Sequence, residues 1–210
     1  MLIVHHLNNS RSQRVLWLLE ELDAPYEIRR YQRDPETNLA PPELEAVHPL
    51  GKSPVLSDGE RTVIESGAII DYLLRRHGGG KLLPPAASEE YEQYLQWLHY
   101  AEGSAMLPLM LRMYTARLPD GGAALQPRIN DELNRHLGYL DRSLEGVDWF
   151  VGNTFSGADV QLSFVAEIAP LLHTLEPFPN LAGFRDRIHA RPAYQRALAK
   201  GGEYAFGPAT

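Results

Sequence analysis

The sequence of 210 residues contains no cysteine. This absence excludes a disulfide framework, a thiolate metal site and a cysteine nucleophile. Basic residues are also few, with 20 Lys and Arg against 27 Asp and Glu and a formal net charge of −7. A nucleic-acid-binding protein usually carries a basic face, so nucleic acid is not an expected partner, and neither is a membrane reached through a polybasic segment.

Long apolar runs are absent as well. No stretch approaches the ~18 consecutive apolar residues of a membrane-spanning helix. A secretory signal begins with a cationic segment followed by an apolar one. The first ten residues do not have this pattern, so a secretory signal is not expected. With no cysteine present, these features predict a cytoplasmic protein. Hydrophobic residues make up 44% of the chain, enough for a sizeable core in one large domain or two small ones.

The first 80 residues alternate between strand and helix patterns. Short apolar runs bounded by turn residues predict strands, and apolar residues spaced three and four apart predict helices. The predicted order is a strand at 2–7, a helix starting near Ser10 and ending at Leu22, a strand near 26–31, a short helix within 40–49, a hairpin at 54–64 and a helix from Ser66 to His77. This alternation predicts an α/β layer fold with a mixed sheet.

The pattern changes after Leu83-Pro84-Pro85 and becomes helical. The expected helices are at 88–117, 123–144, 156–173, 180–190 and 192–200. We therefore predict an α/β domain at 1–80 and an all-α domain at 87–210. Ser156-Gly157-Ala158-Asp159 matches a capping box at the start of one of these helices, so Asp159 is predicted to be structural and not catalytic.

Two short motifs are deceptive. Gly51-Lys52-Ser53 resembles the end of a phosphate-binding loop, but position 46 is Ala where that loop needs glycine, and Pro54 follows where a helix should begin. His5 and His6 are neighbours on a predicted strand and point to opposite faces. No nucleotide or metal site is expected from them.

Three features of the first domain indicate a binding site. Ser10 lies where a strand meets a helix, and a helix N-terminus stabilises an anion such as a thiolate. Ser53-Pro54 enters a strand, where a cis peptide bond would leave the backbone of Ser53 open to an extended peptide. Glu65-Ser66 begins the next helix and could bind the ammonium and carboxylate of an amino acid. Taken alone, Ser10 and Ser66 are each more simply interpreted as helix caps.

These features together resemble the glutathione S-transferase family. The stretches that carry the resemblance are Asn-Asn-Ser-Arg-Ser-Gln-Arg-Val, His-Pro-Leu-Gly-Lys-Ser-Pro-Val-Leu and Glu-Ser-Gly-Ala-Ile-Ile-Asp-Tyr-Leu, and the run Leu-Trp-Leu-Leu-Glu-Glu-Leu-Asp-Ala-Pro-Tyr-Glu looks like a bacterial and fungal branch. The resemblance covers essentially the whole chain. It implies a thioredoxin-like N-terminal domain followed by an all-helical C-terminal domain.

The resemblance also implies roles for particular residues. Pro54 would be the cis-proline, and Ser10 would match the catalytic serine of the serine-type classes. Asn8, Asn9 and Ser12 lie in the same loop and could supply the donor to the sulfur instead. The first strand and its loop contain no Tyr, and the chain has no Cys, so the tyrosine-type and cysteine-type classes are not expected. The implied glutathione-binding residues are Lys52, Ser53, Pro54, Glu65, Ser66, Asn9 and His48.

The implied activity is conjugation of the glutathione thiolate to hydrophobic electrophiles in detoxification, with glutathione as co-substrate and no cofactor or metal. The resemblance implies a cytosolic homodimer, in which Glu102 would reach the partner's glutathione site. Two alternatives stay open: glutathione-dependent reduction of peroxides or disulfides, and a non-catalytic binding module. The sequence does not identify the electrophile. The candidates for lining its pocket, for which core packing is the competing interpretation, are Met106, Met110, Met113 and Tyr114.

Overall fold

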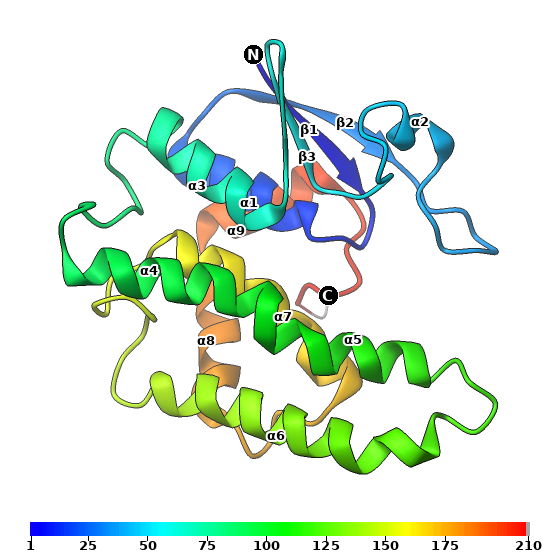
Figure 1. Ribbon diagram of the computed structural model, residues 1–210. Coiled ribbons are helices and arrows are strands. Elements are labelled where there is room, and N and C mark those ends of the chain that lie inside the picture. Colours follow the sequence, from blue (N-terminus) through cyan, green and yellow to red (C-terminus); the bar gives the residue numbers. More distant parts are fainter. Residues whose placement is uncertain (209–210) are drawn as a thin grey trace. The chain divides into compact units, whose positions relative to one another are not determined.

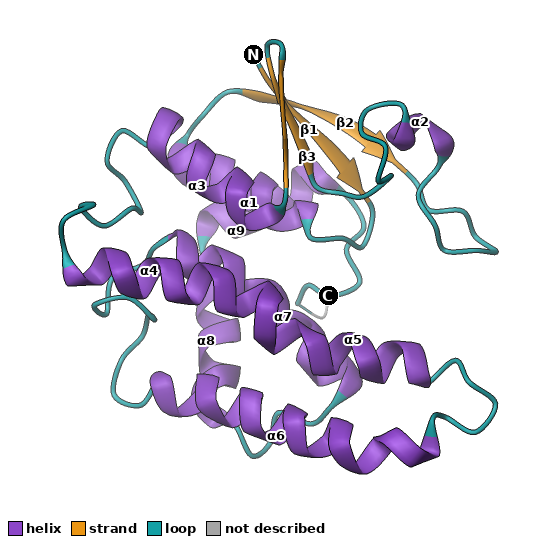
Figure 2. Cartoon of the chain, viewed as in Figure 1, coloured by secondary structure: helices purple, strands orange, loops and turns teal. Residues whose placement is uncertain are grey.

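The computed structural model describes residues 1–208 and divides into two compact units. One unit comprises Met1–Leu83 together with the chain from His189 onward, and the other comprises Pro84–Ile188. Strands occur in the first unit, whereas the second is helical (Figures 1 and 2). The predicted fold class, a thioredoxin-like domain followed by a helical bundle, is confirmed.

The first unit is built on a four-stranded mixed sheet. Its strands are β1 (Leu2–Leu7), β2 (Tyr26–Tyr31), β3 (Val55–Asp58) and β4 (Arg61–Ile64), in the order β2-β1-β3-β4. β1 and β2 are parallel and are connected by helix α1 (Ser12–Leu22), as a parallel pair requires a crossover. β3 pairs antiparallel with both β1 and β4. The short helix α2 (Pro42–Glu45) precedes β3, and α3 (Ser66–His77) follows β4.

Helix α9 (Pro192–Gly201) packs on α1 within the first unit, and Figure 1 shows the two helices side by side. Trp17 of α1 meets Tyr194 of α9 edge to face, with ring centroids 5.4 Å apart. Arg191, just before α9, forms a two-pronged ion pair with Glu21 of α1, with nitrogen–oxygen distances of 2.5 and 3.0 Å. The predicted bounds of the second domain, 87–210, therefore differ from the compact units at the C-terminal end.

The physical reason for this difference lies in α1. Its residues Val15 to Leu19 are all fully buried, so the helix is apolar around its whole circumference at this level. A helix of this kind needs cover on the side away from the sheet as well as on the side against it. The buried residues Ala193, Tyr194 and Ala197 of α9 supply part of that cover.

The second unit consists of helices α4 (Glu89–Tyr100), α5 (Met106–Thr115), α6 (Gln126–Ser143), α7 (Gly157–Leu172) and α8 (Pro179–His189). A π-helical turn, η1 (Ala101–Ala105), joins α4 to α5, and a 3-10 turn, η2 (Ala123–Leu125), precedes α6. The predicted helix at 88–117 is thus interrupted by one wide turn. Within the described residues, no helix has the length and apolar character needed to cross a membrane.

The predicted capping box at the start of α7 is confirmed. The hydroxyl oxygen of Ser156 accepts a hydrogen bond from the backbone N–H of Ala158, and the carboxylate of Asp159 accepts one from the backbone N–H of Ser156 at 2.8 Å. The first thirteen residues of α7 are buried, which makes this helix the centre of its unit. Asp159 is accordingly structural, as predicted.

Candidate active site

The loop from α2 into β3 carries the cis peptide bond between Ser53 and Pro54 that the resemblance led us to expect. The hydroxyl of Ser53 donates a hydrogen bond to the carbonyl of His5 at 2.9 Å and accepts one from the backbone N–H of Leu7 at 3.3 Å. These two bonds tie the loop to the end of β1. They place Ser53 next to the segment that leads from β1 into α1.

Ser10 lies in that segment, just before α1, with 5% of its surface exposed. Its hydroxyl oxygen accepts a hydrogen bond from the backbone N–H of Ser12 at 3.2 Å, and it lies 2.8 Å from the Ser12 hydroxyl oxygen. It also lies 3.4 Å from the hydroxyl oxygen of Ser53. The structure therefore brings together Ser10 and Ser53, which are 43 positions apart in the sequence, at the N-terminus of α1.

Asn8, Asn9 and Ser12, the other residues of this loop that could face the sulfur, each make a hydrogen bond within the first unit. The side-chain oxygen of Asn8 accepts from the backbone N–H of Arg33 at 2.9 Å, and that of Asn9 accepts from the backbone N–H of Ala205 at 2.7 Å. The hydroxyl of Ser12 is fully buried and lies 2.8 Å from Nδ1 of His6. These contacts hold the loop in shape. They also bring the segment after α9 onto it.

Glu65 and Ser66 lie at the start of α3, as predicted. Glu65 is exposed and adopts a positive φ of 66°, and Ser66 is the first residue of the helix and is buried. Nη1 of Arg14 donates a hydrogen bond to the Ser66 hydroxyl oxygen at 3.0 Å. Arg14 is 2% exposed, so a cationic group is held beneath the N-terminus of α3. We did not single out Arg14 in the sequence; the available signal was one arginine within the apolar stripe of α1.

Lys52 and His48 lie in the loop that leads to Ser53. Lys52 is exposed, and His48 is half-buried. The His48 carbonyl accepts from the backbone N–H of Gly51 at 2.9 Å, and its Nδ1 accepts from the backbone N–H of Leu50 at 3.4 Å. His48 thus shapes the turn before Ser53, whereas the Lys52 side chain extends into solvent.

Both halves of the chain match models of known domains. Residues 1–75 match the N-terminal domain of glutathione S-transferases, and residues 104–192 match the C-terminal domain. The chain is 32% identical to glutathione S-transferase 3 of Schizosaccharomyces pombe, an alignment that covers 95% of this chain and 88% of the relative. The chain belongs to the glutathione S-transferase family.

Solved structures of the family agree with this assignment. A glutathione S-transferase from Actinobacillus pleuropneumoniae superposes with a TM-score of 0.89 at 33% identity, covering 98% of this chain and 95% of that one. BphK, a bacterial member of the family, superposes with a TM-score of 0.82 at 25% identity, covering 96% and 100% of the two chains. The aligned residues therefore include both units.

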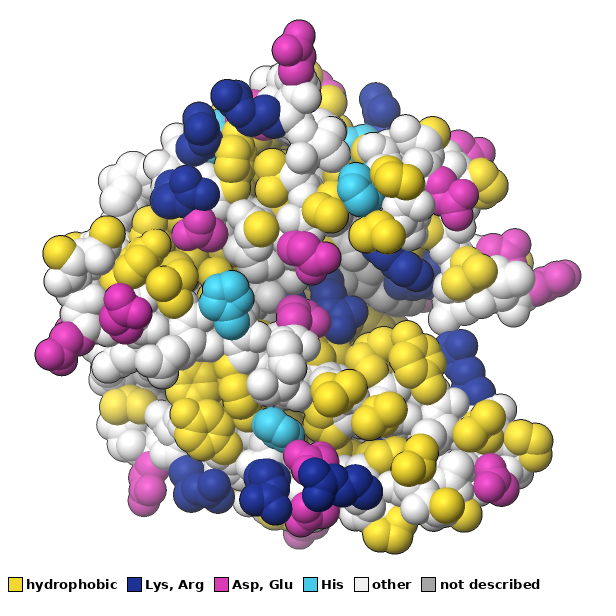
Figure 3. All heavy atoms as spheres, in the orientation of Figure 1, with side chains coloured by type: hydrophobic (Ala, Val, Ile, Leu, Met, Phe, Trp, Pro, Cys, Tyr) yellow, Lys and Arg dark blue, Asp and Glu magenta, His cyan; other side chains and the backbone are white. Residues whose placement is uncertain are grey.

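In this transferase, the four residues predicted to line the electrophile pocket lie on α5 and differ in exposure. Met106 is 1% exposed, Met110 and Met113 are half-buried, and Tyr114 is 54% exposed. Apolar side chains gather over α5 in Figure 3, and the exposed ones there include Leu107, Leu111 and Tyr114. Tyr114 belongs to an open apolar face, whereas Met106 is part of the packed interior.

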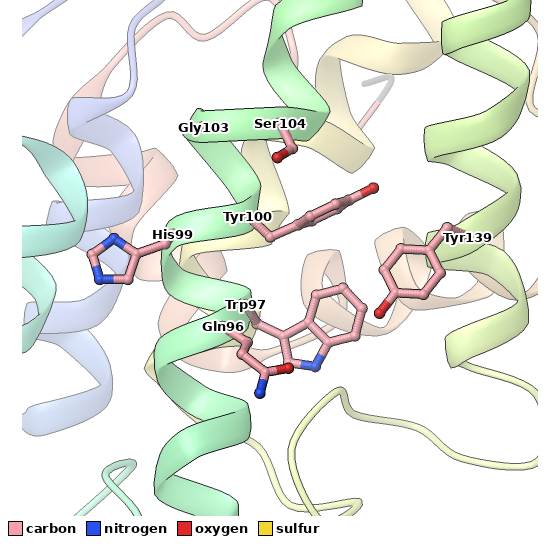
Figure 4. A pocket seen from close by; sticks show the side chains of 7 residues that line it. All are labelled: Gln96, Trp97, His99, Tyr100, Gly103, Ser104 and Tyr139. Carbon is pink, nitrogen blue, oxygen red and sulfur yellow. The ribbon is translucent and has the colours of Figure 1, made fainter.

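A separate pocket of about 480 Å³ lies in the helical unit, along α4, η1 and α6 (Figure 4). Trp97, Tyr100 and Tyr139 pack against one another with ring centroids 5.3 to 5.5 Å apart. The Tyr100 hydroxyl lies 2.7 Å from Nδ1 of His136, and burial raises the pKa of Tyr100. None of the four predicted electrophile residues lines this pocket. The lining residues are Gln96, Trp97, His99, Tyr100, Gly103, Ser104 and Tyr139.

Within the described residues, no group of three or more His, Cys, Asp or Glu side chains could hold a metal ion. Glutathione S-transferases use glutathione as a co-substrate.

Proposed function

We propose that this transferase conjugates the thiolate of glutathione to hydrophobic electrophiles and that Ser10 is the residue that faces the sulfur. The glutathione transferase function itself is supported by the match of both domains to the family. The proposal for Ser10 rests on one observation: its hydroxyl lies 3.4 Å from that of Ser53, at the N-terminus of α1 and beside the cis-proline.

The N-terminus of α1 is suited to a sulfur anion. Backbone N–H groups in the first turn of a helix carry a partial positive charge, and a thiolate placed there has a lowered pKa. Because these dipoles are fixed before the substrate arrives, they stabilise the thiolate without reorganising. The Ser12 hydroxyl is fully buried and lies 2.8 Å from Nδ1 of His6, which supports Ser10 over Ser12 as the hydroxyl that donates to the sulfur.

The N-terminus of α3 is suited to the γ-glutamyl end of glutathione. We propose that Ser66 and the backbone N–H groups after it bind the carboxylate, and that Glu65 binds the ammonium group. The buried guanidinium of Arg14 supports this arrangement, because it donates to the Ser66 oxygen and adds positive charge beneath the carboxylate site.

The remaining predicted contacts complete the glutathione site. The backbone of Ser53 would pair with the cysteinyl part of the tripeptide, and the exposed Lys52 would reach a carboxylate. Asn9 and His48 shape the two loops that frame the site. We therefore propose that Asn9 and His48 mainly maintain the shape of these loops and contribute less to direct binding of glutathione.

The electrophile would contact the apolar face of α5. Tyr114 is exposed there, and Met110 and Met113 are half-buried beside it. Met106 is proposed only as support for these residues, because its side chain is 1% exposed. Flexible methionine side chains suit electrophiles of varied shape.

We further propose a cytosolic homodimer with a detoxifying role. Closed two-fold symmetry is the commonest arrangement among soluble oligomers. Light scattering of the purified protein is expected to give twice the chain mass of 23.6 kDa. A mass equal to that of one chain would contradict the dimer.

The decisive test compares Ser10→Ala with the wild-type protein. We expect both to be retained on immobilised glutathione, and the variant to lose about 10²–10³-fold in kcat/KM towards a chlorinated aromatic, as when a donor to a developing anion is removed. Ser143→Ala serves as the control, because Ser143 lies on α6 and donates only to the backbone of Tyr139.

Each contrary outcome has a separate meaning. Unchanged activity of Ser10→Ala would show that another group faces the sulfur. Turnover of an organic hydroperoxide without conjugation would favour the reductase alternative. Retention on glutathione with no turnover of either substrate would favour a binding module.

A further inference from the structure

The turn that carries Ser10 is contacted by the side chain of Arg33. β1 and β2 are parallel with Leu7 in register with Tyr31, so the segments that follow the two strands leave the same edge of the sheet (Figure 1). The first of these segments is the turn Asn8–Ser10, and the second contains Arg33. The function proposed above uses Ser10 and gives no role to Arg33.

The guanidinium of Arg33 joins three backbone carbonyls. Its Nε donates to the carbonyl of Asn8 at 3.2 Å, and its Nη2 donates to the carbonyl of Asn9 at 3.2 Å. Its Nη1 donates to the carbonyl of Asn38 at 3.0 Å. Each of the three nitrogens therefore has a different acceptor, and the planar group fixes the positions of these acceptors relative to one another.

Arg33 is itself held in place. The loop that follows it is closed by two backbone hydrogen bonds of 2.9 Å, from the N–H of Asp34 to the carbonyl of Leu39 and from the N–H of Asn38 to the carbonyl of Asp34. The backbone N–H of Arg33 donates to the side-chain oxygen of Asn8 at 2.9 Å. Both the backbone and the side chain of Arg33 are thus attached to the turn, and a group that positions another must be fixed in this way.

The contact with Asn9 determines the direction of the peptide group that leads into Ser10. In a trans peptide the C=O and N–H bonds point in opposite directions. Since the Asn9 carbonyl points to Arg33, the backbone N–H of Ser10 points away from Arg33. The Ser10 carbonyl accepts from the backbone N–H of Gln13 at 3.3 Å, in the first turn of α1. The backbone that carries the Ser10 hydroxyl is therefore fixed on both sides.

The conformation of the turn explains why it needs this support. Asn9 has a φ of 50°, in the left-handed region that residues other than glycine seldom adopt. Nη2 of Arg33 holds its carbonyl, and the backbone N–H of Ala205 donates to its side-chain oxygen at 2.7 Å. Without the contacts of Arg33, the peptide between Asn9 and Ser10 could rotate towards a more ordinary backbone conformation.

The surroundings of Arg33 indicate that its hydrogen-bond geometry is what the protein uses. Burial lowers the pKa of Arg33, and no carboxylate of the described residues forms an ion pair with it. The neighbouring Asp34 accepts hydrogen bonds from the backbone N–H groups of Glu36 and Thr37 within its own loop. A half-buried cation is unfavourable unless its N–H groups have acceptors, and here backbone carbonyls supply them.

We propose that Arg33 is a positioning residue of the glutathione site, which holds the turn Asn8–Ser10 so that the Ser10 hydroxyl faces the sulfur. In this role Arg33 does not touch glutathione and acts through Ser10. The proposal rests on Ser10 facing the sulfur, as proposed above. Since a small displacement of a group at the reacting atom can cost about 10²-fold in rate, loss of Arg33 is expected to lower kcat by roughly 10–10²-fold.

Two substitutions in the full-length protein separate geometry from charge. Arg33→Met removes the hydrogen bonds and the charge, whereas Arg33→Lys keeps the charge but has one nitrogen in place of three. We expect kcat towards a chlorinated aromatic to fall by a similar factor in both variants. The absorbance of the glutathione thiolate should appear at higher pH in both than in the wild type, because Ser10 no longer donates well to the sulfur.

Controls show that the variants are folded and that the effect is specific. S-methylglutathione fills the same site without a thiol, so its affinity for both Arg33 variants should be close to that for the wild type. Arg61→Met removes a cation that is exposed on the edge strand β4 of the same unit, and it should leave kcat and the thiolate titration unchanged.

A double-mutant cycle tests whether Arg33 acts through Ser10. In Ser10→Ala the hydroxyl that Arg33 positions is absent, so the addition of Arg33→Met is expected to change kcat and the thiolate titration little. The two substitutions should therefore be far from additive, as is typical of residues that work as a unit. A residue that only stabilised the fold would lower kcat by the same factor with and without the Ser10 hydroxyl.

Four results would overturn the proposal: a kcat and thiolate titration of Arg33→Met equal to those of the wild type, full recovery in Arg33→Lys, additive effects in the double variant, or loss of S-methylglutathione binding in both Arg33 variants. Failure of the function proposed above looks different. In that case the wild-type protein does not bind glutathione, or Ser10→Ala by itself leaves kcat and the thiolate titration unchanged.

Discussion

Replacement of Asp159 by alanine tests how the helical unit is held together. Asp159 is fully buried at the start of α7. One carboxylate oxygen accepts the backbone N–H of Phe150 at 3.0 Å, and the other accepts the backbone N–H and the hydroxyl of Ser156 at 2.8 and 3.0 Å. Asp159→Ala leaves both N–H groups buried without an acceptor.

The expected loss follows from these contacts. A buried donor without a partner costs about 1–3 kcal/mol, so two cost about 2–6 kcal/mol. Part of this is recovered, because burial raises the pKa of Asp159 to about 6 and the variant no longer buries the carboxylate. We expect a net loss of about 2–4 kcal/mol in the free energy of unfolding. At about 2–4 °C per kcal/mol, the melting temperature should fall by roughly 4–16 °C.

Thermal unfolding followed by circular dichroism measures this change. Asp131→Ala is the matched control, because Asp131 is half-exposed on α6 and pairs only with exposed arginines. Asp159→Asn keeps one acceptor oxygen and should fall between the two. Retention on glutathione should survive in all three, since that site belongs to the other unit. A melting temperature of Asp159→Ala within about 1 °C of the wild type would refute the reasoning.

Three further predictions concern the first unit. Glu65→Gln and Ser66→Ala should each raise KM for glutathione about tenfold in steady-state assays with less change in kcat, because they remove binding and leave the sulfur site intact; a fall in kcat alone would contradict this. A chain ending at Ile188 keeps every proposed glutathione contact but lacks the helix that covers α1, so it should fail to stay soluble; a soluble product that is retained on glutathione would refute it. The pKa of His6, about 4 when folded, lies below its unfolded value of 6.5. The contribution of His6 to the free energy of unfolding is therefore fully present above about pH 6.5 and is lost as the pH falls towards 4. In urea unfolding, the free energy of unfolding of His6→Asn should decrease by about 2 kcal/mol less than that of the wild type between pH 7 and 5. Equal decreases would contradict a buried neutral ring.

Local patterns in the sequence were enough to predict much of the fold. The apolar stripe from Val15 to Leu22 predicted α1, and the spacing of Ser156 and Asp159 predicted the cap of α7, because both depend on neighbours a few residues away. The resemblance to a known family led us to expect the cis bond before Pro54, which periodicity alone does not predict.

Contacts between distant segments could not be predicted in this way. The sequence places Ser10 before a helix and Ser53 before a strand, but only the sheet brings their hydroxyls within 3.4 Å. The sequence gives no sign that Arg14, a residue of α1, donates a hydrogen bond to Ser66 at the start of α3. In the sequence His6 was one of two neighbouring histidines, and its link to Ser12 depends on how β1 turns into α1.

The sequence by itself determined the elements, their order and the chemical types available at the start of each helix, since these follow from periodicity and capping over a few residues. Only the tertiary structure decided that α9 packs on α1, that Arg14 bonds to Ser66, and that Ser12 contacts His6. The reason is physical: burial and hydrogen-bond partners depend on which surfaces meet when the whole chain packs.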